Sequence, residues 1–251
     1  TYGTISHRTI FQEAAKKRDL IKHTNKNFAK SINSFLSRLH WRSHFIQKLE
    51  DQPSIEHTSF IPVYDQIRDK DEEKLEAWIE GKTGVHFIDA CMIYLRNHGW
   101  INFRMRAMLA SFASYNLWLD WRYFAPRLAA LFTDFEPGIH YSQIQMQSGT
   151  TGINTIRMYN PYKQAMDQDP LAKFIKSQIP EVKNFPPAFF HNPPKKSLNV
   201  NLFDNELQKE IINVKETAQY ARKKIFDIRK SQEHKILAKN VYLKHGSRGR
   251  S

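Results

Sequence analysis

Apolar residues recur every three or four positions along most of the chain, which is the period of an amphipathic helix. The spacing predicts helices over His7–Lys17, Asn27–Leu49, Asp69–Glu80, Phe87–Asn97, Gly99–Arg122, Tyr123–Phe132 and Lys209–Leu243. No segment shows a convincing alternation of apolar and polar residues, as a half-buried strand would, and no internal repeat is present. We therefore expect an all-α fold, built as a single helical domain with long loops.

Loops are expected where this periodicity fails. Residues 52–62 and 138–161 show little helical pattern, and a loop as long as the second one is more often functional than not. Pro126 predicts a kink or restart in its helix. We divide the chain into a helical domain, residues 1–182, and a region 183–251. In the second region a proline-rich connector, a charged helix and a basic, disordered tail pack on the same domain.

The chain is strongly basic. Its formal net charge of +13 favours polyanionic partners, with nucleic acid as the first candidate and an anionic cofactor as the second. A basic surface with no dedicated partner is the alternative. For the basic clusters at 222–224, 229–230 and 248–250, a solvated helix face is the interpretation that we favour over a dedicated DNA contact.

Cysteine and hydropathy limit the classes further. Cys91 is the only cysteine, which excludes an internal disulfide and a four-cysteine cluster made by this chain alone. No apolar run approaches the ~20 residues of a membrane span, and the first residues lack a signal-peptide pattern. A cytoplasmic location is expected. His40 and His44 lie one helical turn apart, but no third ligand is evident, so no metal site is predicted.

One segment carries a second polar pattern. Asn102 and Arg106 are one turn apart in the helix predicted over Gly99–Arg122, flanked by Phe103 and Met105. An amide and a guanidinium on one face suit a planar, hydrogen-bonding ligand. The alternative is an amphipathic helix whose arginines are ordinary surface charges.

Several segments, in the same order along the chain, resemble one protein family. They are Gly3–Arg8, the Trp-Arg-Ser-His-Phe run at 41–45, and residues 81–112, 117–122, 156–170 and 174–182. Together they resemble the carboxyl-terminal, FAD-binding helical domain of the photolyase/cryptochrome family. The resemblance implies an FAD protein that uses blue light for electron transfer. Photolyases of the family split pyrimidine dimers in DNA, and cryptochromes signal.

The resemblance also implies a set of cofactor-binding residues. Arg106 matches an arginine that lies against the flavin ring, and Asp134 matches the aspartate paired with it. Glu136 stands where the family commonly has a second aspartate, and Arg42 would face the cofactor. Asn102 and Phe103 replace a His-Asn or His-His pair. His140 lies in the segment after Asp134, whose spacing differs from that of the family, and we include it as a cofactor-binding candidate.

Catalytic candidates follow from the same resemblance. Trp41 matches a tryptophan that stacks beside a flipped dimer, and Arg157 an arginine near the lesion. Arg38 replaces a glutamate that contacts the thymine pair in dimer photolyases. Trp121 matches the middle member of the family's tryptophan relay. No tryptophan follows it, and Arg68 occupies the outermost position, so Tyr64, Tyr123 and Tyr141 become alternative electron donors.

Three functions remain open at this stage. The first is a deoxyribodipyrimidine photolyase that acts on damaged or single-stranded DNA. The second is a flavin photoreceptor without repair activity, and the third a nucleic-acid-binding helical module that has lost flavin. The family's amino-terminal α/β domain and the segment that holds the FAD phosphates have no match in this sequence. We expect a missing α/β domain or chain to supply them.

Overall fold

The computed structural model describes residues 4–192 and 209–246, and these residues form helices joined by turns. The elements are α1 (His7–Ile21), α2 (Lys26–Asp51), η1 (Pro53–Glu56), η2 (Pro62–Gln66), α3 (Glu72–Glu80), α4 (His86–His98), α5 (Phe103–Ser111), η3 (Phe112–Asn116), α6 (Trp121–Ala129), α7 (Pro137–Ser148), α8 (Pro161–Gln168), α9 (Lys173–Gln178), η4 (Pro180–Val182), α10 (Pro187–His191), α11 (Val214–Lys230) and α12 (Gln232–His245). No strand occurs within these ranges, so the all-α prediction is confirmed.

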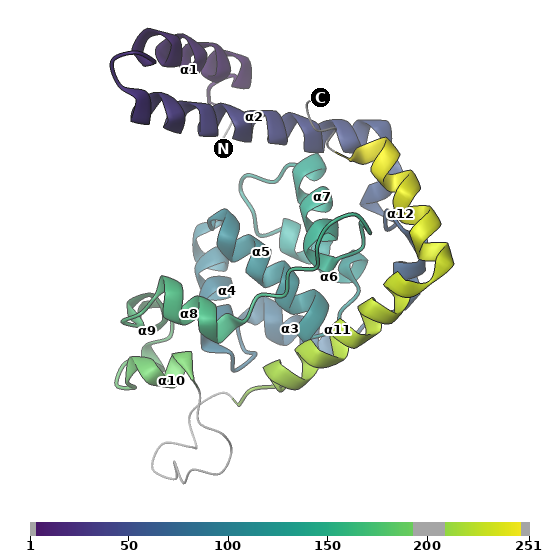
Figure 1. Ribbon diagram of the computed structural model, residues 1–251. Helices are drawn as coiled ribbons and strands as arrows, with labels where there is room; N and C mark the ends of the chain where they lie inside the picture. Colours follow the sequence, from purple (N-terminus) through teal and green to yellow (C-terminus); the bar gives the residue numbers. More distant parts are fainter. Residues whose placement is uncertain (1–3, 193–208, 247–251) are drawn as a thin grey trace.

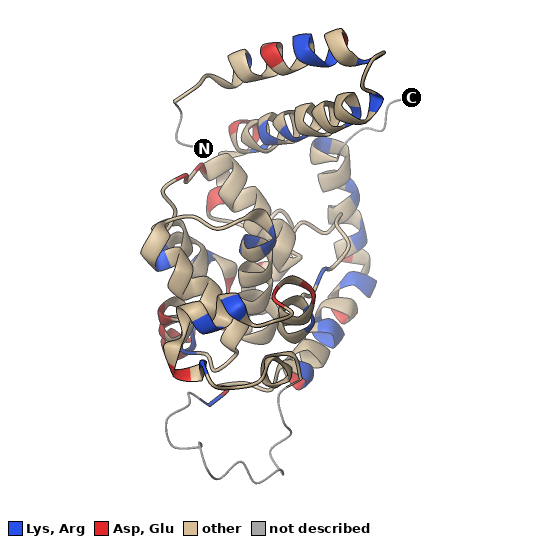
Figure 2. Cartoon of the chain, turned by 90° about the vertical axis from the view of Figure 1, so that its left-hand side faces the viewer, with Lys and Arg blue, Asp and Glu red and all other residues tan. Residues whose placement is uncertain are grey.

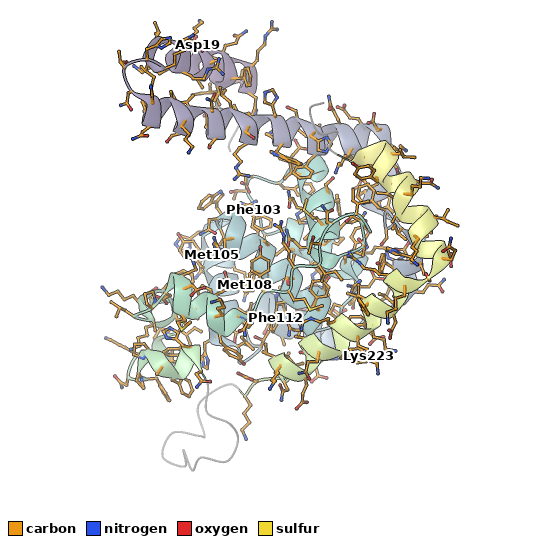
Figure 3. All side chains as sticks on the ribbon, viewed as in Figure 1. Asp19, Phe103, Met105, Met108, Phe112 and Lys223 are labelled. Carbon is orange, nitrogen blue, oxygen red and sulfur yellow. The ribbon has the colours of Figure 1, made fainter. Side chains whose placement is uncertain are left out.

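Helices α3 to α7 form the centre of the molecule (Figure 1). Helices α1 and α2 make an antiparallel pair above it, and α2 packs on α7. Helices α8 to α10 lie on one side, while α11 and α12 run along the other. The larger apolar core gathers residues from α3 to α7, including Trp78, Met92, Met108, Phe124 and Leu128. In Figure 3 the labelled Met108 and Phe112 extend from the middle of the bundle.

A second apolar cluster attaches α11 and α12 to the centre. Ala221, Ile225 and Val241 are buried against residues of the 52–67 segment and of η3, among them Ile55 and Tyr115. The Asn116 amide nitrogen also donates to the Val214 carbonyl oxygen at 3.1 Å. The apolar positions of the charged carboxyl-terminal helix therefore do face the rest of the protein.

The prediction of one helix from Gly99 to Arg122 was wrong. Asn102 caps α5, the chain widens into the π-helical turn η3, and Trp118 takes a left-handed φ of 59°. Backbone bonds between Asp69 and the 118–120 segment fill the break, and Asp120 then caps α6. The apolar pattern predicts a continuous helix because residues of the break, such as Leu117 and Leu119, are buried although they are not helical. Pro126 lies inside α6, so the restart occurs at Trp121 and not at the proline.

The expectation of a loop over 138–161 was wrong for its first half, which is helix α7. Glu136 caps this helix, Pro137 occupies its first turn, and Gly149 ends it with φ of 72°. Proline at the start and glycine after the end are ordinary helix boundary signals. The pattern was hidden because α7 buries Gln145, Gln147 and Ser148 along with apolar residues.

Gln145 explains how so polar a helix can be buried. Its Oε1 accepts the Phe60 backbone N–H at 2.8 Å, and its Nε2 donates to the carbonyl oxygens of Ile55 at 2.8 Å and Thr58 at 3.0 Å. Buried amides are tolerated when their hydrogen bonds are satisfied in this way. These bonds tie α7 to the 52–62 segment, which the sequence analysis had treated as a plain loop.

Three smaller predictions also have outcomes. The single helix expected over Lys209–Leu243 is divided at Ser231, whose hydroxyl caps α12 by accepting the His234 N–H at 3.2 Å. The proline-rich connector follows η4 directly and contains the short α10. The Gly3 start of the first matched motif, the connector's last residues and most of the basic tail lie outside the described residues.

Gly149 offers a test of the close packing around α7. A Cβ at this position would lie 2.6 Å from the Tyr115 hydroxyl oxygen and would sit in a left-handed conformation. Gly149→Ala should therefore lower the free energy of unfolding by about 1–3 kcal/mol. Chemical denaturation of the purified protein measures this change.

Tyr115→Phe is the matched second variant. The Tyr115 hydroxyl is buried and has no hydrogen-bond partner among the described residues, so its removal alone should be neutral or stabilising by up to about 1 kcal/mol. The double variant should lose less stability than Gly149→Ala alone. Simple additivity of the two changes would contradict the predicted contact.

Candidate functional site

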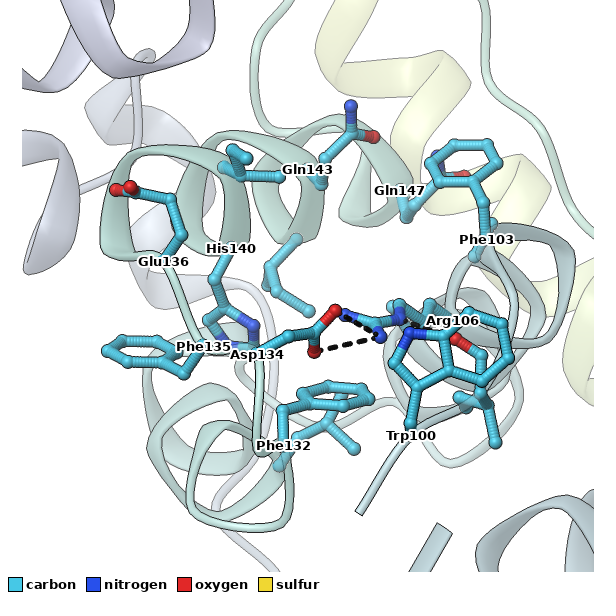
Figure 4. A pocket seen from close by; sticks show the side chains of 16 residues that line it. Trp100, Phe103, Arg106, Phe132, Asp134, Phe135, Glu136, His140, Gln143 and Gln147 are labelled. Atoms are coloured by element: carbon cyan, nitrogen blue, oxygen red, sulfur yellow. Dashed lines mark hydrogen bonds and ion pairs between the residues drawn. The ribbon is translucent and has the colours of Figure 1, made fainter. Parts of the chain in front are cut away.

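A cavity of about 340 Å³ opens between α5, the 132–136 turn and α7 (Figure 4). The volume lies at the lower end of the range typical of ligand pockets. Its walls are mostly apolar and aromatic, with a few polar groups. The labelled lining residues are Trp100, Phe103, Arg106, Phe132, Asp134, Phe135, Glu136, His140, Gln143 and Gln147.

Arg106 and Asp134 form an ion pair in this cavity. One guanidinium nitrogen, Nη2, donates to both carboxylate oxygens, at 2.9 and 3.0 Å, and Nε donates to the Ile101 carbonyl oxygen at 2.9 Å. The guanidinium carbon lies 4.1 Å from the centre of the Phe132 ring. With side-chain exposures of 27% and 15%, the pair is partly buried. The structure thus contains the pair that the family resemblance implied. Its guanidinium contacts the Asp134 carboxylate, the Ile101 carbonyl oxygen and the Phe132 ring.

Glu136 stands at the edge of the cavity and joins it to α2. Its Oε1 accepts the Gly138 N–H at 3.1 Å as the cap of α7, and its Oε2 lies 3.4 Å from Nη2 of Arg42. Arg42 itself is not among the lining residues. In this structure Arg42 therefore reaches the cavity through Glu136, and direct contact with a cofactor stays a prediction.

His140 is a partly buried, neutral histidine in the cavity wall. Its Nε2 lies 2.9 Å from the Ala125 carbonyl oxygen, which can only accept, so Nε2 carries the proton. Burial and the charge of Arg106 together lower the pKa of His140 to about 4, while the hydrogen bond to Ala125 opposes the shift. Edge-on contacts with Phe132, Phe135 and Tyr141 hold the ring. The other ring nitrogen, Nδ1, is left as an acceptor.

Asn102 and Phe103 have different roles in the structure. The Asn102 side-chain oxygen accepts the Met105 N–H at 3.1 Å as the cap of α5, and Asn102 does not line the cavity. Asn102 therefore does not share a helix face with Arg106, as the helical pattern had predicted. Phe103 is exposed and lines the cavity mouth together with Trp100. Sequence reasoning gave Trp100 no role, although an aromatic residue directly after the helix-ending Gly99 is a usable signal.

Gln143 and Gln147 form the polar part of the opposite wall. They lie one turn apart on α7, and Figure 4 shows both on the side across from the ion pair. The side-chain oxygen of each is buried and has no hydrogen-bond partner among the described residues. Buried acceptors without partners are costly. Gln143 and Gln147 are therefore the polar side chains of this wall whose oxygens lack a partner within the described ranges, and helical periodicity missed them because α7 is polar as well as buried.

The catalytic candidates lie outside this cavity. Trp41 is a half-exposed residue on α2 whose ring contacts His44 and Phe45 of its own helix. Arg157 is exposed in the segment after α7 and lines a separate hollow beside α11 and α12. The two residues thus have different neighbours, and their predicted catalytic roles stay predictions.

Trp121 is fully buried at the start of α6. Its indole nitrogen donates to the Ser59 hydroxyl at 2.8 Å, and its ring centre lies 6.4 Å from that of Tyr141. Tyr141 in turn lies 5.2 Å from His140 in the cavity wall. An unbroken series of ring contacts therefore leads from the cavity through Tyr141 to Trp121. Among the alternative donors named from the sequence, this geometry favours Tyr141.

Neither a metal centre nor a membrane-spanning helix is found among the described residues. Residues 4–192 and 209–246 contain no group of three or more His, Cys, Asp or Glu side chains that could hold a metal ion. None of their helices is long and apolar enough to cross a membrane.

Comparisons with known proteins identify relatives over most of the chain. Residues 35–238 match the family described as the FAD binding domain of DNA photolyase. The chain is 32% identical to the deoxyribodipyrimidine photo-lyase of Escherichia coli over 64% of its length and 35% of that protein. It is 28% identical to cryptochrome-1 of Spalax judaei, covering 76% of the chain and 32% of that protein.

A solved structure resembles the fold closely. The archaeal photolyase from Sulfolobus tokodaii, described with two FAD molecules, has a TM-score of 0.73 and 30% identity, covering 90% of this chain and 48% of that one. The chain therefore spans about a third to a half of the length of these relatives.

The lowered pKa of His140 predicts a pH dependence of stability. Below its ordinary pKa of 6.5, the unfolded imidazole binds a proton that the folded one, with a pKa of about 4, does not bind. The free energy of unfolding should therefore fall by up to about 3 kcal/mol between pH 6.5 and pH 4 through this group. His140→Gln, which keeps an N–H donor for Ala125, should flatten the profile.

Denaturant titrations at several pH values compare this variant with wild type and with His23→Gln, a change at an exposed histidine. Parallel profiles for wild type and His140→Gln would contradict the prediction.

Proposed function

The chain belongs to the family of FAD binding domains of DNA photolyases, and we propose that its cavity holds the flavin ring of FAD for light-driven chemistry on DNA. The observation that carries the proposal is the partly buried Arg106–Asp134 pair, which lines a mostly aromatic and apolar cavity together with the polar side chains of Gln143 and Gln147. A flavin ring is planar and has hydrogen-bonding groups along its edge. This combination of groups is what such a ring requires.

The residues of the cavity have distinct tasks in this proposal. Arg106 supplies positive charge next to the ring, and Asp134 fixes its position. Gln143 and Gln147 accept hydrogen bonds from donors of the cofactor, and neutral His140 offers its Nδ1 without adding charge. Trp100 and Phe103 exclude water at the mouth. When bound, FAD supplies blue-light-driven electron transfer, with Tyr141 and Trp121 as the ring contacts nearest to the cavity that could carry charge.

Repair of pyrimidine lesions in DNA is the activity that we favour. The net charge of +13 suits a polyanion, the exposed Trp41 offers a ring on which a base can stack, and Arg157 offers an exposed cation. Because the chain spans only part of its photolyase relatives, we assign this activity to the chain acting with an α/β domain or partner chain. We propose that this partner holds the FAD phosphates and that the protein acts in the cytoplasm.

A flavin photoreceptor without repair activity is the second candidate. It is favoured by Arg38, an exposed arginine on α2 at the position where the resemblance implies a lesion-binding glutamate. The positive charge would attract a phosphate and could not accept hydrogen bonds from a base pair. A helical nucleic-acid module without flavin is the third candidate. The mostly aromatic and apolar cavity with its partly buried Arg106–Asp134 pair weighs against it.

The cofactor proposal predicts loss of FAD when the ion pair is broken. Asp134→Ala leaves the guanidinium of Arg106 without its carboxylate, so FAD should bind at least about tenfold more weakly. Glu76→Ala, which removes a partner of Arg127 in a surface pair, is the control and should bind FAD normally. Flavin absorbance after gel filtration of the full-length gene product measures retention. A wild-type protein that purifies colourless and takes up no added FAD would contradict the proposal.

The DNA proposal predicts a role for Trp41 in affinity. Trp41→Ala should weaken binding to dimer-containing single-stranded DNA by about 1–3 kcal/mol, because a stacked base loses its platform. Phe35→Ala removes another half-exposed aromatic residue of α2 and serves as the control. Binding should also weaken steeply with added salt, since each neutralised phosphate releases counterions. Salt-insensitive binding, or equal losses for both variants, would refute this assignment.

A further inference from the structure

A hollow separate from the cofactor cavity lies where the 155–158 segment meets α11 and α12. Its volume is about 750 Å³, and it is lined by Thr155, Ile156, Arg157, Met158, Arg222, Phe226, Arg229, Lys230 and Lys235. We call it the α11–α12 groove. More than half of its lining residues are cationic, and none is acidic. The basic clusters at 222–224 and 229–230, for which the sequence favoured a solvated helix face, thus contribute residues to a concave surface.

Arg229 builds the wall of this groove and has no carboxylate partner there. Its Nη2 donates to the Asn154 carbonyl oxygen at 2.8 Å, which ties the 155–158 segment to α11. Its Nε is buried without a hydrogen-bond partner among the described residues. The cation is therefore held in place by a neutral group and keeps its charge uncompensated.

A second arginine, Arg68, shares Tyr115 as a neighbour with Arg229. Arg68 is buried, donates only to the carbonyl oxygens of Ser114 and Ser148 within the described residues, and leaves its Nη1 unpaired. Burial raises the pKa of Tyr115 to about 12, although the charges of Arg68 and Arg229 oppose this shift. No ion pair neutralises either arginine in the ranges 4–192 and 209–246. Asp120 acts on Arg68 by its charge, but no carboxylate lines the groove, so the positive potential there favours an anion.

The groove also offers an aromatic ring. Phe226 is 56% exposed, and the ammonium group of Lys230 lies 4.4 Å from its ring centre. Figure 2 shows Lys and Arg spaced along the two carboxyl-terminal helices, so positive charge continues beyond the groove. A basic groove that follows a backbone, with an aromatic ring on which a base can stack, is the arrangement that sequence-tolerant binders of single strands use.

We propose that the α11–α12 groove binds the phosphate backbone of a single-stranded nucleic acid, with Arg222 and Lys235 on phosphates and Phe226 against a base. This assignment rests on the DNA-binding part of the proposed function and adds to it a surface that does not require a lesion. The groove binds strands through charge and stacking alone, and lesion choice belongs to Trp41 and the cofactor cavity.

Charge reversal inside and outside the groove separates this proposal from a general field effect. Arg222→Glu with Lys235→Glu changes two lining cations. Lys223→Glu with Lys239→Glu changes two exposed lysines of the same helices that do not line it. Lys223 is labelled on α11 in Figure 3. Both double variants change the net charge by the same amount. A difference in affinity between them therefore depends on where the replaced cations lie. Unfolding midpoints equal to that of wild type check that both remain folded.

Fluorescence anisotropy with an undamaged oligothymidylate of about 16 nucleotides measures affinity at several salt concentrations. The groove variant should bind at least about tenfold more weakly, and its salt slope should fall by about 1.4, which is two contacts of about 0.7 each. The control variant should lose markedly less affinity. Equal losses in the two variants, or no binding by wild type at low salt, would overturn the proposal.

Two further measurements identify the ligand and distinguish the groove proposal from the repair proposal. At matched ionic strength, inorganic phosphate or thymidine monophosphate should compete poorly. Competition as strong as that of the oligomer would show an isolated anion site and overturn the strand assignment. The ratio of affinities for damaged and undamaged strands should be unchanged in the groove variant. If wild type shows no lesion preference while the groove effect persists, the repair proposal fails and the groove assignment stands.

Discussion

The burial of helix α7 is the constraint on which the rest of the structure depends. This helix packs on α2, α5 and α6, and it supplies one wall of the cofactor cavity. It is rich in amides, so its position requires that Gln145 satisfies its hydrogen bonds with the backbone at Ile55, Thr58 and Phe60. Gly138 and Gly149 allow close approach at either end, to Ile46 and to Tyr115. With α7 fixed, Gln143, Gln147 and His140 line the same cavity as the ion pair formed by α5 and the 132–136 turn.

The fold was largely predictable because apolar period dominates most of its helices. Residues 26–51 and 72–80 bury one face and leave the other more open to solvent, which is the pattern that periodicity detects. The failures share one physical cause. In the break at 117–120 apolar residues are buried without being helical, and in α7 polar residues are helical while buried. Neither case can be recognised from hydropathy alone.

The candidate site was only partly predictable. The Arg106–Asp134 pair could be named from family resemblance, because it depends on residue types that the motif retains. Gln143 and Gln147 could not, because their role depends on which face of α7 meets the cavity. Asn102 was assigned to the ligand, yet its side chain caps α5, as an asparagine before a helix commonly does. The clustering of Arg157 with α11 and α12 depends on tertiary contact and has no local signal.

The central claim is that a flavin ring occupies the cavity between the Arg106–Asp134 pair and the two glutamines. A crystal structure of the protein grown with saturating FAD tests it most directly. The account predicts a planar ring in the cavity, with the Arg106 guanidinium beside it and an amide of Gln143 or Gln147 within hydrogen-bond distance of its edge. A flavin bound elsewhere on the protein, or an empty cavity in a crystal that holds FAD at another site, would contradict it.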